Sequence, residues 1–335
     1  MSSKAVFEFL SKHSSLIITT HDPADADGLG AEKILYLIAK SMRKKVRIIN
    51  ANPIPEIFRF MDPENVVETW KNCRKNINRN AALVIIDTTD EYHIGEPREI
   101  IPRVSEVFAI DHHEPNKFCT FTGYIDSNAS STCEMAVELA QDAGIVVPTE
   151  YAEAAYAGLV YDTGFFAYSK TTNRTFKAAL AMVETGINPY KIYQALNENS
   201  STGALLLQKK VLSTLEIYNQ GRVAVQVFQK EDLETTGAQF EDAENFINIP
   251  LRSREIEVSV LIKETREGQT RCSLRSKGSV NVSKIAQSLG GGGHVSAAGF
   301  KSTLGPVETL ATVLERVTVA LLNTAEDQSD GRLPS

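Results

Sequence analysis

The first half of the chain alternates short apolar runs with amphipathic stretches. Between the first two runs, residues Ile34, Leu35 and Ile38 recur at the spacing of one helical face, which predicts a helix over Gly30–Ser41. Alternation of this kind is typical of a mostly parallel α/β sheet with flanking helices. The apolar runs are rich in Val and Ile and predict strands at Leu16–Thr20, Val46–Asn50, Ala82–Asp87 and Val107–Asp111, with further helices at Thr132–Ala143 and Ala152–Tyr161.

The second half follows a different pattern. Residues 175–219 have a helical pattern that Gly186 and Pro189 interrupt. Strand-like runs return from Arg222 onward, which indicates a smaller α+β domain. Its predicted elements are strands at Val223–Gln229, Glu257–Thr265 and Gln269–Arg275 and helices at Val282–Leu289 and Pro306–Thr324. We therefore predict an N-terminal α/β domain over residues 1–190, a helical linker over 191–221, the α+β domain over 222–325 and a frayed tail over 326–335.

Composition narrows the class of protein. An apolar fraction of 42% with 23% charged residues in 335 residues is typical of globular domains. The net charge of −7 argues against a broad grip on duplex nucleic acid, but it allows a short nucleotide held by a local basic cluster. The four cysteines form no CxxC pair and are expected to be reduced thiols. No apolar run reaches the ~20 residues of a membrane span, and no signal peptide is apparent, so we predict a cytoplasmic protein without a membrane contact.

Acidic and imidazole side chains gather at the ends of the predicted strands. Three of the six histidines lie there. Because ligands of an open α/β sheet bind at the carboxyl ends of its strands, these side chains are expected to meet at one rim. The clusters are His21, Asp25 and Asp27 after the first strand, Asp87 at the end of the third, Asp111, His112 and His113 at the end of the fourth, and Asp162 after an apolar helical stretch.

The chemistry of this set favours a pair of divalent cations. Oxygen and imidazole ligands suit Mn²⁺, Mg²⁺ and Co²⁺, and two such ions commonly share a bridging carboxylate. Taken singly, each aspartate has a plainer interpretation as a turn residue, and Asp27 also as a helix cap. The joint pattern at successive strand and helix ends favours the metal site.

Five segments resemble the motifs of the DHH superfamily of phosphoesterases. They are HDPADADGLGA, IIDTTD, DHH and YDTG in the first half, and GGGGHVSAAGF, which is similar to the glycine-rich motif of the DHH-associated domain. Their order and spacing most resemble the subfamily of bifunctional oligoribonucleases (nanoRNases) and phosphatases of 3′-phosphoadenosine-5′-phosphate (pAp). The resemblance covers essentially the whole chain.

This resemblance implies a role for each residue of the predicted site. His21 and Asp25 would hold one cation, and Asp27, His112 and Asp162 the other, with Asp87 bridging the two. Asp111 would orient a histidine, and His113 would contact the reacting phosphate and act as a general acid. The family likeness implies two divalent cations, with Mn²⁺ favoured over Mg²⁺ or Co²⁺, and a homodimer.

In the second domain the resemblance assigns substrate binding to Arg275, Ser276 and His294 and to the glycines Gly291, Gly292 and Gly293. Glycine backbones approach an anion closely, and arginine prefers a bidentate phosphate contact. A flexible surface loop and a solvated strand-edge arginine remain open as alternatives. One departure is notable: related proteins often carry an arginine soon after the YDTG motif, whereas the stretch here is Phe165–Tyr168, which leaves the substrate preference open.

The predicted function is two-metal hydrolysis of short oligoribonucleotides, dinucleotides or pAp, with short RNA or a mononucleotide as partner and no duplex. Two alternatives stay open. An inorganic pyrophosphatase or polyphosphatase would share the metal motifs, and a non-catalytic nucleotide sensor could keep the fold. His13 and His93 are predicted to be surface residues without a role.

Overall fold

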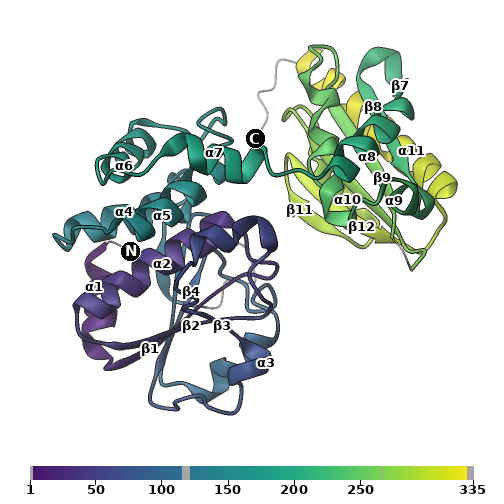
Figure 1. Ribbon diagram of the computed structural model, residues 1–335. Coiled ribbons are helices and arrows are strands. Elements are labelled where there is room, and N and C mark those ends of the chain that lie inside the picture. The colour runs from purple at the N-terminus through teal and green to yellow at the C-terminus, as the bar shows by residue number, and fades with distance from the viewer. Residues whose placement is uncertain (1–2, 115–120, 266, 330–335) are drawn as a thin grey trace. The chain divides into compact units, whose positions relative to one another are not determined.

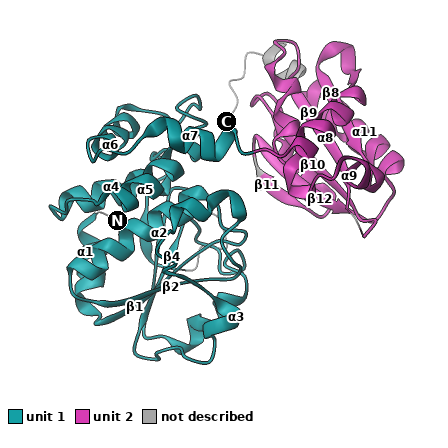
Figure 2. Cartoon of the chain, in the orientation of Figure 1, with its two compact units in different colours: residues 1–199 teal, residues 200–335 magenta. Residues whose placement is uncertain are grey.

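The computed structural model describes residues 3–114, 121–265 and 267–329. The chain divides into two compact units, residues 1–199 and 200–335, which Figure 2 shows in different colours. Each unit has its own sheet and its own hydrophobic core. The predicted fold class is confirmed: a parallel sheet with flanking helices is followed by a helical segment and a smaller α+β unit with a mixed sheet.

The first unit is built on a six-stranded parallel sheet in the order β3-β2-β1-β4-β5-β6 (Figure 1). The four predicted strands are present, and two edge strands of three residues, β3 and β6, were not predicted. The strands are β1 Ser15–Thr20, β2 Lys45–Asn50, β3 Val67–Thr69, β4 Ala82–Ile86, β5 Val107–Asp111 and β6 Gly123–Ile125.

Both faces of this sheet are buried, which explains its continuous apolar strands. Val84 and Ile86 belong to the core cluster on the side of α2, α4 and α5, whereas Leu83 and Ile85 pack in a second cluster with Trp70 of α3. Figure 1 shows these two groups of helices on opposite faces. The helices are α1 Ser3–Lys12, α2 Ala26–Ser41, α3 Trp70–Cys73, α4 Thr132–Asp142, α5 Thr149–Asp162, α6 Asn173–Val183 and α7 Pro189–Asn197, with 3₁₀ segments at Glu56–Met61 and Glu96–Arg103.

Glycines allow α2 and α5 to approach closely. A Cβ atom at Gly158 would lie 2.4 Å from Cys133 Sγ and 2.6 Å from the carbonyl oxygen of Ala26. A Cβ at Gly30 would lie 2.5 Å from the carbonyl oxygen of Ala154. This close packing holds the last turn of α5 beside the first turn of α2, and it thereby fixes where Asp162 can reach.

The second unit carries a mixed sheet in the order β11-β12-β10-β9-β8-β7, in which only the pair β8–β9 is parallel among the described strands. Helices α10 and α11 pack on one face, and α8, α9 and short 3₁₀ segments pack on the other. The elements are α8 Thr202–Ser213, β7 Glu216–Tyr218, β8 Val223–Phe228, α9 Lys230–Thr236, β9 Val258–Glu264, β10 Thr270–Ser276, α10 Val282–Ser288, β11 Gly292–His294, β12 Ala297–Ser302 and α11 Pro306–Ser329, with 3₁₀ segments η4 Phe240–Ala243, η5 Phe246–Asn248 and η6 Pro250–Arg252.

Two predictions were wrong. The helical pattern does not continue to residue 219, because Glu216–Tyr218 form β7 and pair with β8. His13 is not a surface residue: it is 8% exposed, and its Nε2 lies 3.1 Å from Glu106 Oε2.

Other predictions concern the ends and the thiols. Cys73, Cys133 and Cys272 are free thiols, as expected, and all three are buried, whereas Cys119 lies outside the described residues. Helix α11 runs to Ser329, and the remainder of the predicted tail, residues 330–335, also lies outside them. Among the described residues, no helix is both long and apolar enough to cross a membrane.

Candidate metal centre

The predicted site residues of the first unit lie together at the carboxyl edge of the parallel sheet. His21 follows β1, Asp87 follows β4, and β5 ends at Asp111. Helix α2 begins at this edge and helix α5 ends there, at Asp162. Three overlapping sets of side chains offer ligand atoms that lie within 4.8 Å of one another.

The first set consists of His21, Asp25 and Asp87. His21 Nε2 lies 3.5 Å from Asp25 Oδ1 and 3.4 Å from Asp87 Oδ2. Asp25 is the N-cap of α2, and its Oδ1 accepts hydrogen bonds from the backbone N–H groups of Asp27 and Gly28 at 3.0 and 3.1 Å. The start of the helix therefore fixes this carboxylate at the rim.

The second set consists of Asp27, His112 and Asp162. His112 Nε2 lies 3.1 Å from Asp162 Oδ2 and 3.9 Å from Asp27 Oδ2. Asp27 is fully buried, and both of its carboxylate oxygens accept backbone N–H groups from the first turn of α4, from Thr132 at 2.7 Å and Cys133 at 2.8 Å. The amino end of α4 thus orients Asp27 and partly offsets its charge.

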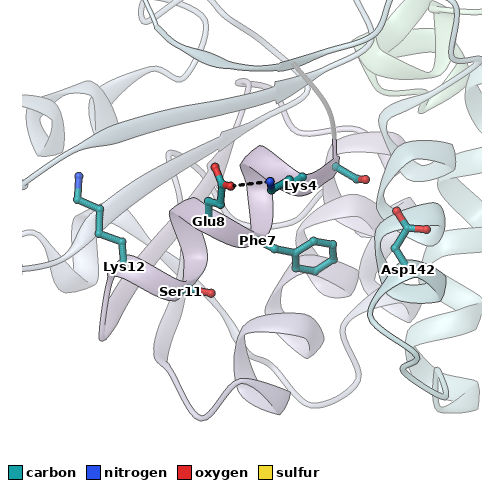
Figure 3. A pocket seen from close by; sticks show the side chains of 7 residues that line it. Lys4, Phe7, Glu8, Ser11, Lys12 and Asp142 are labelled. Carbon is teal, nitrogen blue, oxygen red and sulfur yellow. Dashed lines mark ion pairs between the residues drawn. The ribbon is translucent and has the colours of Figure 1, made fainter.

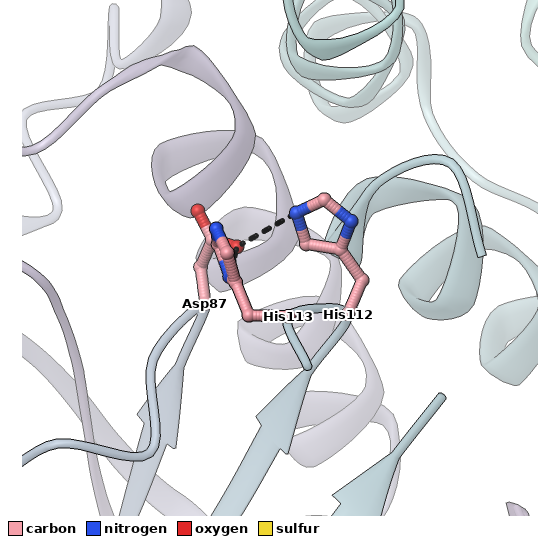
Figure 4. Close-up of side chains that lie close together, drawn as sticks. All are labelled: Asp87, His112 and His113. Carbon is pink, nitrogen blue, oxygen red and sulfur yellow. Dashed lines mark ion pairs between the residues drawn. The ribbon is translucent and has the colours of Figure 1, made fainter. Parts of the chain in front are cut away.

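Asp87 lies between these two sets. Its Oδ2 faces His21, and its Oδ1 lies 3.6 Å from His112 Nε2, a contact visible in Figure 4. The backbone of Asp87 adopts a left-handed conformation with φ of 62°, which aspartate tolerates better than most residues. The hydroxyl of Thr132 donates to Asp87 Oδ1 at 2.8 Å. A carboxylate with one oxygen toward each set has the geometry of a bridging ligand.

Asp111 and His113 form a separate pair at the end of β5. Asp111 Oδ1 accepts the backbone N–H of His113 at 3.0 Å and lies 2.7 Å from His113 Nδ1. His113 Nδ1 also lies 3.6 Å from Asp87 Oδ1, which makes a third set of Asp87, His112 and His113. The contact with Asp111 fixes the orientation of the His113 ring. Asp111 is buried, whereas His113 is partly exposed.

Crowding of carboxylates shapes the electrostatics. Burial raises the pKa of Asp27 well above its usual range, and the charges of Asp87, Asp162 and Asp25 raise it further. Burial also raises the pKa of Asp162. Burial alone would lower the pKa of His21, but hydrogen bonds to Asp25 and Asp87 outweigh it and raise the pKa to about 11. Divalent cations would offset this excess of negative charge.

The donor set fits such cations. The three sets contain carboxylate oxygens and imidazole nitrogens and no thiolate, which suits Mn²⁺, Mg²⁺ or Co²⁺. Among the described residues, neither buried ring nitrogen of His112 makes a hydrogen bond of good geometry, although Nε2 lies 3.1 Å from Asp162 Oδ2. An imidazole left in that state is costly unless a ligand such as a metal ion binds it. The residues present therefore fit two divalent cations.

The predicted substrate residues lie in the second unit. Arg275 lies in β10, where its Nη1 donates to the carbonyl oxygen of Leu274 at 3.3 Å. Ser276 is buried, and its Oγ accepts N–H groups of Gly278 and Val280, so it also stabilises the turn after β10. The backbone of His294 ends β11.

The glycine run forms the β11–β12 hairpin. A Cβ at Gly291 would lie 2.2 Å from the carbonyl oxygen of Gly299, and one at Gly293 would lie 2.5 Å from that of Ala297. These two glycines are therefore required by the hairpin itself. A Cβ at Gly292 would meet nothing within 4 Å, so its backbone is open to a neighbouring molecule.

Sequence reasoning missed Thr132 and the backbone N–H groups of α4. The helix itself was predicted, and Ser131 before it is a recognisable N-cap residue. The contact with Asp27 was not predictable because it spans more than a hundred positions and depends on how α4 crosses the sheet edge.

A surface depression elsewhere on the first unit lacks this chemistry. It is lined by residues of α1, including Lys4, Phe7 and Glu8, and by Asp142 at the end of α4 (Figure 3). Lys4 and Glu8 form an exposed ion pair at 3.7 Å. Without convergent ligands or a buried polar group, this depression is given no role.

A parallel α/β unit whose carboxyl edge carries carboxylate–imidazole sets, followed by a mixed-sheet unit, defines a class of two-domain proteins built to hold divalent cations. Comparison of the sequence with known families agrees with that class. The profile of the DHH family, N-terminal domain, matches residues 15–159, and that of the DHHA1 domain matches residues 220–321. The chain belongs to the DHH family of phosphoesterases and carries a C-terminal DHHA1 domain.

Individual relatives agree on the family and differ in activity. The chain is 29% identical to the bifunctional oligoribonuclease and PAP phosphatase NrnA of Thermus thermophilus, over 85% of this chain and 83% of that protein. It is 27% identical to the cyclic-di-AMP phosphodiesterase PdeA of Listeria monocytogenes, over 95% of this chain but 47% of that longer protein. The fold is similar to a solved exopolyphosphatase-related protein from Bacteroides fragilis, with a TM-score of 0.86 at 24% identity over 95% of this chain and 97% of that one.

Proposed function

We propose that this protein is a phosphoesterase that uses two divalent cations, Mn²⁺ foremost, to hydrolyse short oligoribonucleotides, dinucleotides and pAp. The observation that carries the proposal is the position of Asp87, whose two carboxylate oxygens face His21 on one side and His112 on the other. In this proposal His21 and Asp25 hold one cation, Asp27, His112 and Asp162 hold the second, and Asp87 is shared between them.

The side chains of the site have distinct tasks in this reaction. Bound divalent cations supply Lewis-acid stabilisation of the phosphoryl oxygens and acidify water. Asp111 orients the imidazole of His113 through Nδ1, and His113 is assigned to the leaving oxygen. Burial lowers the pKa of His113, but the hydrogen bond to Asp111 and the nearby carboxylates outweigh it and raise the pKa to about 9. The imidazolium form of His113, which these carboxylates favour, can act as a general acid.

Three considerations support a short nucleotide substrate. Relatives named as NrnA act as oligoribonuclease and PAP phosphatase, and PdeA acts on cyclic-di-AMP, so nucleotide phosphates recur among the proteins that this chain resembles. Arg275 offers the second unit a guanidinium suited to phosphate. The net charge of −7 favours a small substrate over duplex nucleic acid. We assign Arg275, Ser276, His294 and the glycine run to substrate binding on this basis.

Substitution of Asp87 tests the proposal. Asp87→Asn keeps the side-chain shape in a left-handed backbone position but removes the bridging charge. We expect Mn²⁺-dependent hydrolysis of a diribonucleotide and of pAp to fall by more than about 100-fold, because loss of outer partners of a metal site already costs about 10–100-fold. Chromatography of the products measures the rate, and Asp142→Asn, an exposed position at the end of α4, is the matched control.

Parallel assays decide among substrates. Pyrophosphate, linear di-adenylate and pAp are compared with the diribonucleotide under the same Mn²⁺ concentration. Faster turnover of pyrophosphate than of every nucleotide would contradict the proposed nucleotide substrates and favour an inorganic pyrophosphatase. Undiminished hydrolysis by Asp87→Asn would contradict the proposal of a two-cation site bridged by Asp87. The homodimer implied by the family resemblance stays a prediction, and light scattering on the purified protein measures it.

A further inference from the structure

Three positively charged side chains lie next to one another on neighbouring strands of the sheet in the second unit. In the strand register, Arg271 of β10 lies opposite Lys263 of β9 on one side and opposite Lys301 of β12 on the other. Side chains of directly opposed residues project from the same face of a sheet. Leu261 of the same β9 face packs with the helices α8 and α9, so the three cations share that face. Arg275 lies on the same face, because it is four residues farther along β10 and side chains alternate between the two faces.

This row is unfavourable in the protein alone. Like charges directly opposite each other destabilise a sheet. Among the described residues, none of Lys263, Arg271 and Lys301 forms an ion pair with a carboxylate. Lys263 is only 8% exposed, and Arg271 Nε is buried without a hydrogen-bond partner in the described part of the chain. A solvated surface patch would place Lys263 and the Nε of Arg271 in water, so an ordinary charged face does not account for these two groups.

The ring of Phe240 contacts two of the cations, whereas none of the described carboxylates comes within ion-pair distance of them. Lys263 Nζ lies 5.1 Å from the centroid of Phe240, and Arg271 Cζ lies 5.4 Å from it. Burial lowers the pKa of Lys263, and the positive charges of Arg271 and Arg275 lower it further, while Glu244 opposes this effect. The fold thus holds a desolvated ammonium next to a guanidinium, and a bound anion would stabilise both charges.

We propose that Lys263, Arg271 and Lys301 form a phosphate subsite of the second unit that binds a phosphate group of a nucleotide. The identity of the ligand as a nucleotide rests on the proposed function, whereas the anion site rests on the row itself. Neighbouring strands lie about 4.8 Å apart, so the row spans about 10 Å along the backbone, a span over which the long side chains of lysine and arginine can converge on one phosphate. The subsite favours nucleotides that carry a terminal phosphate, such as pAp or a 5′-phosphorylated dinucleotide.

Calorimetric titration of the full-length protein in EDTA tests the subsite without hydrolysis. The ligands are pAp, adenosine and inorganic phosphate. We expect pAp to bind more tightly than phosphate, and adenosine to bind most weakly. Arg271→Gln is expected to weaken pAp binding by about tenfold or more, since a hydrogen bond to a charged group is worth about 1.5–3 kcal/mol. Lys301→Gln is expected to weaken it less, because Lys301 is exposed and screened by salt.

Lys284→Gln is the matched control, since Lys284 is exposed on α10 and that helix packs on the opposite face. Urea unfolding adds a second readout: Arg271→Gln should be at least as stable as the wild type, because it relieves repulsion, whereas a structural role for Arg271 would cost stability. Unchanged pAp affinity in both Arg271→Gln and Lys301→Gln, or equal weakening in Lys284→Gln, would overturn the subsite. Equal affinities for phosphate and pAp would overturn its assignment to a nucleotide.

The titration that tests the subsite can be interpreted separately from the hydrolysis assay that tests the proposed function. Absence of Mn²⁺-dependent hydrolysis in the wild type would contradict the function and leave the titration in EDTA valid. Normal hydrolysis combined with unchanged titrations would contradict the subsite alone.

Discussion

Single side chains at the carboxyl edge of the first sheet are held by partners that bind no cation themselves. Thr132 provides two such contacts, its backbone N–H to Asp27 and its hydroxyl to Asp87. Asp25 is held by the first turn of α2, and Asp111 holds His113. Such partners fix the orientation of ligands before a metal ion arrives and lower the cost of binding it.

Replacement of Thr132 measures that contribution. Thr132→Val keeps the shape and the backbone N–H but removes the hydroxyl that donates to Asp87 Oδ1. We expect the Mn²⁺ concentration for half-maximal hydrolysis to rise by about tenfold. Thr132→Ser retains the hydroxyl and should stay close to the wild type. Equal behaviour of the Val and Ser variants would show that the hydroxyl does not matter.

Glu32 gives a pH dependence with a defined sign. It is fully buried in α2, with Asn50 donating to its Oε2 at 2.9 Å, and burial raises its pKa to about 8. The folded protein therefore binds a proton that the unfolded chain, with an ordinary pKa of about 4.5, has released. Stability from this group is present below pH 4.5 and is lost as the pH rises to about 8.

Urea unfolding in EDTA across that window measures the effect. The free energy of unfolding should decline by an amount on the order of a few kcal/mol as the pH rises, after the contributions shared with the variant are subtracted. Glu32→Gln keeps the hydrogen bond from Asn50 and carries no titratable proton, so its decline should be shallower. Parallel curves for the two proteins would contradict the burial of an ionisable Glu32.

Among the elements, length and composition decided what the sequence could predict. Strand β4 is a run of buried apolar residues and was predicted closely, whereas β3 and β7 are three residues long and carry no such pattern. Strand β11 consists of two glycines and a histidine, a composition that disfavours strands. It forms because Gly291 and Gly293 allow the chain to lie against β12. The glycine content therefore gives no strand signal, and the strand forms through its pairing with β12.

The candidate site was predictable in its membership because parallel strands end at one edge. His21, Asp87 and His112 follow directly from this rule. Asp162 lies at the end of a helix, so its convergence depended on the packing of α5 on α2, which no local pattern shows. The cation row of the second unit was missed for a related reason: Lys263, Arg271 and Lys301 are far apart in sequence, and only the register brings them together.

The contact between α2 and α5 can be tested at Gly158. Gly158→Ala places a methyl group 2.6 Å from the carbonyl oxygen of Ala26, a backbone atom that cannot rotate away. We expect the free energy of unfolding to fall by about 1–3 kcal/mol, as for overpacked cores, and hydrolysis to weaken because Asp162 moves away from His112. Glu153→Ala in the same helix should stay within about 0.5 kcal/mol of the wild type. A fully stable and active Gly158→Ala would contradict the close approach.

On the scale of the whole molecule, opposite charges are gathered in different units. The first unit concentrates buried carboxylates around Asp87, and the second lines up Lys263 with Arg271. Each arrangement is unfavourable in the protein alone and favourable once its ligand is bound, a divalent cation in one case and a phosphate in the other. Both units are therefore less stable than they could be without a binding site. This predicts that the order of stability of the wild type and a variant reverses when the ligands are removed.

Removal of cations is expected to produce that reversal at Asp87. In EDTA, Asp87→Asn should melt at a higher temperature than the wild type, because it removes one of the negative charges that crowd Asp27. With Mn²⁺ at about 100 times its dissociation constant, the wild type gains about 2.7 kcal/mol for each bound cation, or several degrees, since the cations bind only the folded state. Asp87→Asn should gain much less and should then be the less stable protein.

Hydrogen exchange locates the gain along the chain. Protection on addition of Mn²⁺ should rise in residues 15–20, 82–87 and 107–111, the strands that end at the site, and should not change in strands β8 to β10. The cations bind groups on the first unit alone in this proposal, so segments of the second have no reason to respond. Equal protection of both units would contradict binding of the cations to the first unit. A wild type that stays more stable than Asp87→Asn in EDTA would mean that the carboxylates around Asp87 do not destabilise one another and do not need cations to stabilise them.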